Sequence, residues 1–91
     1  MIYDVEWLES AQREFDALWA AADDDAKLVI SQALDNAIDR LTIAPYSQSE
    51  ERTSFTARVL FALPLRIEFR MDRFKGALVV THVRLVRKRG K

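Results

Sequence analysis

Residues 65–71 alternate strictly between apolar and charged side chains. The apolar set is Leu65, Ile67, Phe69 and Met71, and the charged set is Arg66, Glu68 and Arg70. Successive side chains of a β-strand point to opposite faces of the sheet, so this pattern predicts a strand with one covered face and one open face. The rest of the chain must therefore cover one side of a sheet with apolar elements.

Three more segments have strand character. Residues 2–7 place Tyr3, Val5 and Trp7 on one side and acids on the other, and residues 57–63 and 77–87 are rich in β-branched and aromatic residues. Leu63-Pro64 predicts a tight turn into residues 65–71, and residues 72–76 predict a five-residue turn containing glycine. If Val59 and Phe61 face inward, Arg58 lies on the open face. In residues 77–87 the period of two separates Val79 and Val83 from His82 and Arg84.

Two amphipathic helices are predicted between the first and second strands. Residues 9–22 carry apolar side chains at spacings of three and four, with Arg13, Glu14 and Asp16 on the opposite arc. Asp23-Asp24-Asp25 suits the start of a second helix, because a carboxylate accepts hydrogen bonds from first-turn N–H groups. Its apolar stripe runs from Ile30 to Leu41, and Pro45 stops it.

These elements predict a single α+β domain over residues 1–91 with the order β-α-α-β-β-β. The expected architecture is an antiparallel sheet with an N-terminal helical hairpin packed on one face. Residues 46–56 are polar without periodicity, so we expect a loop there. The expected core is Phe15, Leu18, Trp19, Ile30, Leu34, Ile38, Leu41, Val59, Phe61, Ile67, Phe69, Val79 and Val83.

Composition excludes several classes of site. The chain has no cysteine and one histidine, which rules out disulfides, thiol nucleophiles and multi-histidine metal sites. It has no Gly-rich phosphate loop, and we expect no cofactor. The N-terminus shows no leader pattern, and no apolar run approaches the roughly 20 residues of a membrane span. We expect a cytoplasmic protein.

The charges are sorted by position. Residues 1–51 carry 12 acidic and 3 basic side chains, whereas residues 52–91 carry 2 acidic and 11 basic ones. The halves are therefore −9 and +9. A basic surface of this kind favours phosphates or an acidic polypeptide, unless the acidic half neutralises it within the fold.

The open face is the candidate site. Arg66, Glu68 and Arg70 share it, and His82 and Arg84 can join them from the neighbouring strand. Arginines bind phosphate and stabilise the charge of a pentacoordinate phosphorus, while His82 or Glu68 could move protons, so the chemistry it suits is metal-free phosphoryl transfer. The alternatives are a solvated charge ladder and a strand histidine that is hydrogen-bonded locally.

The ordered set of segments resembles the RelE/ParE superfamily of type II toxins over nearly the whole chain. The segments are Tyr3-Asp4-Val5-Glu6-Trp7, Leu18-Trp19, Ala37-Ile38-Asp39-Arg40-Leu41, Arg58-Val59-Leu60, Leu65-Arg66-Ile67-Glu68-Phe69 and Leu78-Val79-Val80. In that family the RelE branch cuts mRNA in the ribosomal A site without metal, and the ParE branch poisons DNA gyrase. Both are held inactive by a cognate antitoxin.

The resemblance assigns residues by position. Arg66 resembles the arginine of a family strand in which Phe69 replaces the usual tyrosine, and Arg58 resembles the basic residue of the preceding strand. By this resemblance Arg66 and Arg58 have catalytic roles, while Glu68 and His82 are catalytic candidates through their place on the open face and not through the resemblance. RNA binding is expected of Arg70, Arg84, Arg87, Lys88 and Arg89. The chain has Leu85-Val86-Arg87-Lys88-Arg89 where many such nucleases have a Gly-His-Arg segment, and His82 comes earlier than the family's histidine.

Two functions therefore stand in competition. The first is a ribosome-dependent mRNA endoribonuclease, with the ribosome, mRNA and an antitoxin as partners in a toxin–antitoxin hetero-oligomer. The second is a non-nuclease toxin acting on DNA gyrase, or an interaction module that retains only the toxin fold. The resemblance implies no cofactor and no metal for either.

Overall fold

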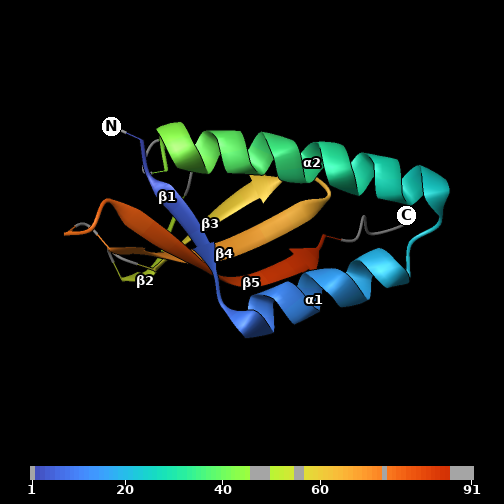
Figure 1. Cartoon of the computed structure of the whole chain (residues 1–91), viewed down its shortest axis with the longest axis horizontal. Coiled ribbons are helices and arrows are strands. Elements are labelled where there is room, and N and C mark those ends of the chain that lie inside the picture. Colours follow the sequence, from blue (N-terminus) through green and yellow to red (C-terminus); the bar gives the residue numbers. More distant parts are fainter. Residues whose placement is uncertain (1, 46–49, 55–56, 73, 87–91) are drawn as a thin grey trace.

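A computed structural model describes residues 2–45, 50–54, 57–72 and 74–86. The elements are β1 (Asp4–Trp7), α1 (Glu9–Ala20), α2 (Asp24–Ile43), β2 (Glu50–Ser54), β3 (Ala57–Ala62), β4 (Leu65–Asp72) and β5 (Ala77–Leu85) (Figure 1). The α+β class and both helices are confirmed. All four predicted strands are present, with ends within two residues of those expected.

The sheet has five strands in the order β1-β5-β4-β3-β2. β3, β4 and β5 form an antiparallel meander, but β1 runs parallel to β5, so the expectation of a purely antiparallel sheet is wrong. The expected loop is also wrong over residues 50–54, which form β2 against β3. The β2 segment, Glu-Glu-Arg-Thr-Ser, has no apolar period, so its strand conformation comes from backbone pairing at a sheet edge.

β4 is the central strand and confirms the alternation. Leu65, Ile67, Phe69 and Met71 are buried, whereas Arg66 and Glu68 are partly exposed and Arg70 is exposed. Gly76 closes the turn into β5 with φ of 63°, a left-handed conformation that glycine adopts without a steric penalty.

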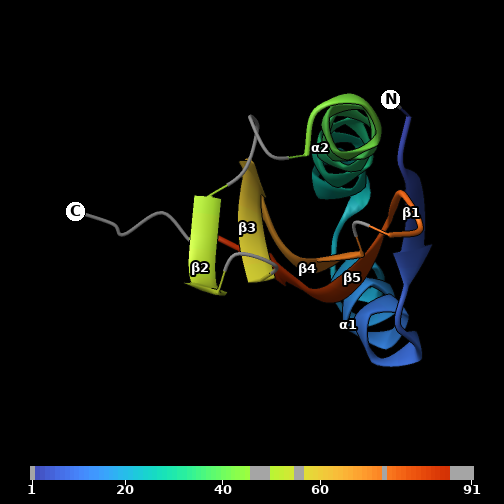
Figure 2. The ribbon, with the colours of Figure 1, turned by 90° about the vertical axis from the view of Figure 1, so that its left-hand side faces the viewer.

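α2 covers the apolar face of the meander. Asp23 caps it by accepting a hydrogen bond from the Ala26 N–H at 2.8 Å, and Ile30, Ala33, Ala37 and Leu41 are buried along one stripe. α2 packs on β3, β4 and β1, whereas α1 packs mainly on β5. Figure 2 shows α2 over the concave side of the curved sheet and α1 beside β5. The helical hairpin is thus opened out, with α1 along the edge of the sheet.

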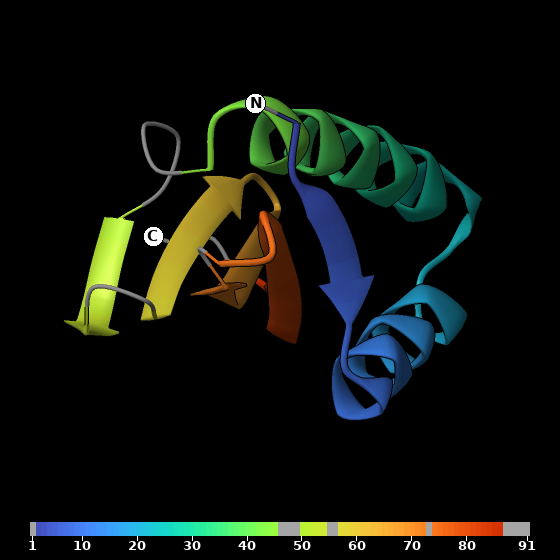
Figure 3. The ribbon, with the colours of Figure 1, turned by 60° about the vertical axis from the view of Figure 1, so that its left-hand side comes forward.

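β1 links the two helices across this edge. The Tyr3 N–H donates to the Thr42 carbonyl at 2.9 Å near the end of α2, and β1 then runs to the start of α1 (Figure 3). Trp7 contacts Phe15 edge-to-face, and Phe15 stacks on Trp19. These rings extend the core to α1. Within the described ranges, no helix is both long enough and apolar enough to cross a membrane.

The predicted facing of β3 is wrong at Phe61, although Val59 is buried as expected. Leu60 and Ala62 are in the core, opposite Ile67 and Leu65, while Phe61 lies opposite Arg66 and is 40% exposed. The two-residue turn at Leu63-Pro64 sets this register, because it places residue 62 opposite residue 65.

The predicted facing of β5 holds only for its second half. Thr81 is an extra residue between the pairs Phe69–Val80 and Glu68–His82. This bulge reverses the alternation, so Leu78 and Val80 are buried before it and Val83 is buried after it. Val79 is consequently not in the core, but His82 lies on the open face as expected.

Candidate functional site

The open face brings four predicted residues into direct register. Arg66 of β4 lies opposite Arg84 of β5, and Glu68 lies opposite His82. Arg66 donates a hydrogen bond from Nη1 to Oε2 of Glu68, and both side chains are mostly shielded from solvent. Two guanidinium groups placed opposite each other repel, so the pairing of Arg66 with the Glu68 carboxylate stabilises the arrangement.

A second carboxylate comes from α1. Glu14 Oε1 accepts the Val83 N–H at 3.0 Å, while its Oε2 lies 3.5 Å from His82 Nδ1 and 3.6 Å from Arg84 Nη2. We call Arg66, Glu68, His82, Arg84 and Glu14 the open-face network. It combines two guanidinium groups, two carboxylates and the imidazole across β4, β5 and α1.

The environment of Glu14 shifts its acidity. Burial raises the pKa of Glu14, but the hydrogen bond from Val83 and the interactions with His82 and Arg84 outweigh it, so the pKa is lowered from the usual 4.5. Glu14 is therefore held as a carboxylate beside the imidazole.

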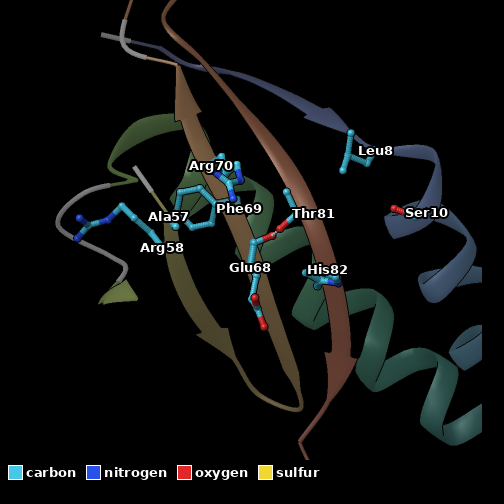
Figure 4. A pocket seen from close by; sticks show the side chains of 9 residues that line it. All are labelled: Leu8, Ser10, Ala57, Arg58, Glu68, Phe69, Arg70, Thr81 and His82. Atoms are coloured by element: carbon cyan, nitrogen blue, oxygen red, sulfur yellow. Dashed lines mark hydrogen bonds between the residues drawn. The ribbon is translucent and has the colours of Figure 1, made fainter. Parts of the chain in front are cut away.

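A hollow of about 430 Å³ opens over this face. Its lining comes from α1 and the residue before it, β3, β4 and β5, namely Leu8, Ser10, Ala57, Arg58, Glu68, Phe69, Arg70, Thr81 and His82 (Figure 4). The Thr81 hydroxyl donates to the Glu68 carbonyl at 3.2 Å and ties β5 to β4 at the bulge. The bulge thus lies in the wall of the hollow, where it turns His82 onto the open face.

Arg58 lines the hollow but is not opposite Arg66 in the sheet. It lies opposite Phe69, whose side chain is in the core, and it is 9% exposed. Figure 4 shows its guanidinium pointing away from Glu68 and His82. The expectation that Arg58 lies beside Arg66 is wrong, because it assumed the opposite facing of β3. The predicted RNA-binding residues Arg87, Lys88 and Arg89 lie outside the described residues.

The arrangement suits anionic ligands. Arg70 and Arg84 are exposed beside the hollow, and a guanidinium offers several N–H donors in one plane. The imidazole of His82 adds two ring nitrogens that can donate or accept a hydrogen bond. Among the described residues, no three His, Asp or Glu side chains form a group that could hold a metal ion.

Comparison with known proteins identifies the fold. No protein-family profile matches the chain, and no curated protein matches it in sequence. Among solved structures, it resembles the RelBE2 toxin–antitoxin complex of Mycobacterium tuberculosis with a TM-score of 0.71 and 14% identity, covering 93% of this chain and 92% of that one. The chromosomal ParDE system of P. aeruginosa gives a TM-score of 0.71 and 14% identity, covering 94% and 98%. The chain has the RelE/ParE-like toxin fold.

The isolated E. coli RelE toxin is similar too, with a TM-score of 0.66 and 13% identity over 96% of this chain and 87% of that one. A RelE/ParE-like fold is thus shared with toxins of both branches. The fold alone does not distinguish a nuclease from a gyrase-directed toxin.

Sequence reasoning missed Glu14. It was assigned to the solvent arc of α1, although it precedes Phe15 and so borders the apolar stripe. Its partner, the Val83 N–H, becomes available because β1 ends at Trp7, opposite Val80. The position at which β1 ends along β5 depends on the parallel pairing of the two strands, and no pattern in the sequence indicates this pairing.

Proposed function

We propose that the chain is the toxin of a type II toxin–antitoxin system and acts as a ribosome-dependent, metal-independent mRNA endoribonuclease in the cytoplasm. The observation that carries this proposal is the open-face network beside the hollow, in a chain with the RelE/ParE-like toxin fold. Arginines, an imidazole and carboxylates on one accessible surface are the groups that RNA cleavage needs without a metal.

The proposed reaction begins at a ribose 2′-OH. His82 accepts the proton from this hydroxyl, and the 2′ oxygen forms a bond to the adjacent phosphorus. The bond from phosphorus to the 5′ oxygen of the next nucleotide breaks, which leaves a 2′,3′-cyclic phosphate, and the departing oxygen takes a proton from water. Arg66 stabilises the extra negative charge on the phosphoryl oxygens. Its Nη1 donates to Glu68, and the remaining N–H donors of the guanidinium are the ones that would bind the phosphate.

Phosphate contacts along the RNA fall to the exposed arginines. Arg70 and Arg84 flank the catalytic pair Arg66 and His82 on the same face. Arg87, Lys88 and Arg89, which follow β5 in the sequence, are proposed to bind RNA as well. Such contacts position the strand and make binding sensitive to salt, but they do not lower the chemical barrier directly.

The proposed partner is a cognate antitoxin. The similar structures from M. tuberculosis and P. aeruginosa were solved as toxin–antitoxin systems, and residues 52–91 carry a charge of +9 that attracts an acidic segment. Co-expression with an adjacent antitoxin reading frame should relieve growth arrest and co-purify a hetero-oligomer whose affinity falls as salt rises. Toxicity unchanged by that partner would count against this assignment.

A second function has support of its own. The ParDE system matches as well as RelBE2 does, and in the free chain carboxylates engage the guanidinium groups of Arg66 and Arg84. A face neutralised in this way suits contact with a protein such as DNA gyrase, or a purely binding role in a degenerate toxin-fold module. The effect of replacing Arg66 on the rate of mRNA cleavage distinguishes the two functions.

The test is single-turnover cleavage of mRNA on programmed ribosomes. Arg66→Ala should lower the cleavage rate roughly 100-fold or more, the size of one lost electrostatic contact in a transition state. Arg66→Lys should recover little, because lysine lacks the planar fork that binds two phosphate oxygens. The matched control is Lys75→Ala, which removes an exposed cation from the turn between β4 and β5 and should leave the rate unchanged.

Each variant should first be shown to keep the wild-type circular dichroism spectrum. Equal losses for Arg66→Ala and Lys75→Ala would mean that only bulk charge matters, and the catalytic role of Arg66 would then be wrong.

A further inference from the structure

Glu14 lies beside the edge of β5, beyond the end of β1. β1 pairs with Ala77–Val80 of β5 and ends there, and within the described ranges no strand pairs with this edge of β5 beyond Val80. The Val83 N–H faces this edge, and Glu14 Oε1 accepts it at 3.0 Å. A backbone hydrogen bond from a rigid strand thus fixes the position of a carboxylate that a helix delivers.

The second oxygen of the same carboxylate faces the imidazole. Glu14 Oε2 lies 3.5 Å from His82 Nδ1, at the outer limit of a hydrogen bond, and 3.6 Å from Arg84 Nη2. Because both neighbours lie on β5, Glu14 holds the open-face side chains of that strand from one side. Burial raises the pKa of Glu14, but the hydrogen bond from the Val83 N–H, the neighbouring His82 and the Arg84 charge together lower it, so the carboxylate is ionised there.

Among the described residues, charged groups surround His82 on four elements. Glu68 and Arg66 face it from β4, Arg84 adjoins it on β5, and Glu14 reaches it from α1. Arg58 of β3 and Arg70 of β4 line the same hollow. Glu68 pairs with Arg66. Among the contacts described, the carboxylate with an oxygen near Nδ1 is that of Glu14.

We propose that Glu14 is the positioning residue of His82, and that its carboxylate keeps Nδ1 protonated so that Nε2 carries the free lone pair. A carboxylate can only accept a hydrogen bond, so it favours the tautomer that donates from Nδ1. The imidazole lines the hollow, and Nε2 is the ring nitrogen left to take a proton there. The catalytic consequence rests on the proposed function, whereas the tautomer does not.

The tautomer can be measured without any substrate. His82 is the only histidine, so one set of imidazole signals appears in a long-range ¹⁵N–¹H correlation spectrum. At a pH where the ring is neutral, the wild type should show a protonated Nδ1 and an unprotonated Nε2. In Glu14→Gln the amide oxygen can still accept the Val83 N–H, but the amide NH₂ then faces Nδ1, so the preference should shift toward the Nε2–H tautomer.

The control is Glu9→Gln on the same helix. Glu9 pairs with Arg13 at 3.0 Å on an exposed surface, so its loss should leave the imidazole signals unchanged. Identical tautomers in the wild type and Glu14→Gln, with the fold intact in both, would overturn the proposal.

Kinetics separate positioning from simple stabilisation. In single-turnover cleavage, Glu14→Gln should slow the wild-type reaction roughly 10- to 100-fold, below the full range of general acid–base catalysis, and should have no further effect in a His82→Ala background. Equal losses in both backgrounds would mean that Glu14 acts independently of His82, and the proposal would be wrong. A wild type that does not cleave would refute the proposed nuclease, while the tautomer result would still decide the role of Glu14.

Discussion

The facing of β3 makes a sharp prediction about stability. Leu60 is fully buried on the α2 side of the sheet, opposite Ile67, whereas Phe61 is 40% exposed and lies on the open face opposite Arg66. Leu60→Ala should therefore destabilise the protein more than Phe61→Ala, although phenylalanine loses the larger side chain. A strand with Val59 and Phe61 facing the core would give the reverse order.

The magnitudes follow from burial. Leu60→Ala removes three carbon atoms, worth about 2.4 kcal/mol in transfer free energy at about 0.8 each, and the cavity term brings the loss to about 3–4 kcal/mol. Phe61→Ala opens no closed cavity, because its site is in contact with solvent, and we expect about 1 kcal/mol. The difference of about 2 kcal/mol is well above experimental error in equilibrium unfolding.

The assay is urea unfolding at neutral pH, followed by far-ultraviolet circular dichroism. The m-values should stay equal among wild type and both variants, so that the midpoints report the free energy of unfolding. A loss for Phe61→Ala equal to or larger than that for Leu60→Ala would refute the register of β3, and the placement of Arg58 opposite Phe69 would fail with it.

Two further predictions concern side chains on the helices. Asp23→Ala should lower the free energy of unfolding by about 1 kcal/mol, because it removes the cap of the Ala26 N–H, while Asp35→Ala in the middle of α2 should not destabilise the protein; equal effects in urea unfolding would contradict this. Glu14 has a lowered pKa in the folded state, so its contribution is present above its unfolded pKa of about 4.5 and is lost as pH falls through the folded value. The free energy of unfolding of the wild type minus that of Glu14→Gln, measured by urea unfolding across the acid range, should therefore decrease as pH falls below about 4.5. A difference that increases toward acid pH would contradict this prediction.

The sequence predicts best where one face of an element is uniformly apolar. The apolar stripe of α2 from Ile30 to Leu41 and the alternation of β4 each allow only one face to be buried. The structure buries that face in both elements. β3 is different, since Val59, Leu60, Phe61 and Ala62 are all apolar and the period of two cannot choose a face. The length of the turn at Leu63-Pro64 determines which face of β3 is buried, because it fixes which residues of β3 lie opposite those of β4.

The remaining differences come from tertiary pairing. The bulge at Thr81 lies within a run of β-branched residues that carries no local signal, and β2 is a polar edge strand that forms only because β3 offers its backbone. Glu14 joins the candidate site for a similar reason, since its hydrogen bond depends on where β1 ends. The open face itself was predictable from Arg66, Glu68 and His82, but its second carboxylate was not.

The central claim is that this RelE/ParE-like chain cleaves mRNA on the ribosome. The most direct measurement incubates the purified wild type with programmed ribosomes and, in parallel, with DNA gyrase and relaxed plasmid. We predict single-turnover mRNA cleavage, with 2′,3′-cyclic phosphate ends and no loss of supercoiling activity. Intact mRNA together with inhibited supercoiling would contradict the account and make Arg66 a binding or structural residue of a gyrase-directed toxin.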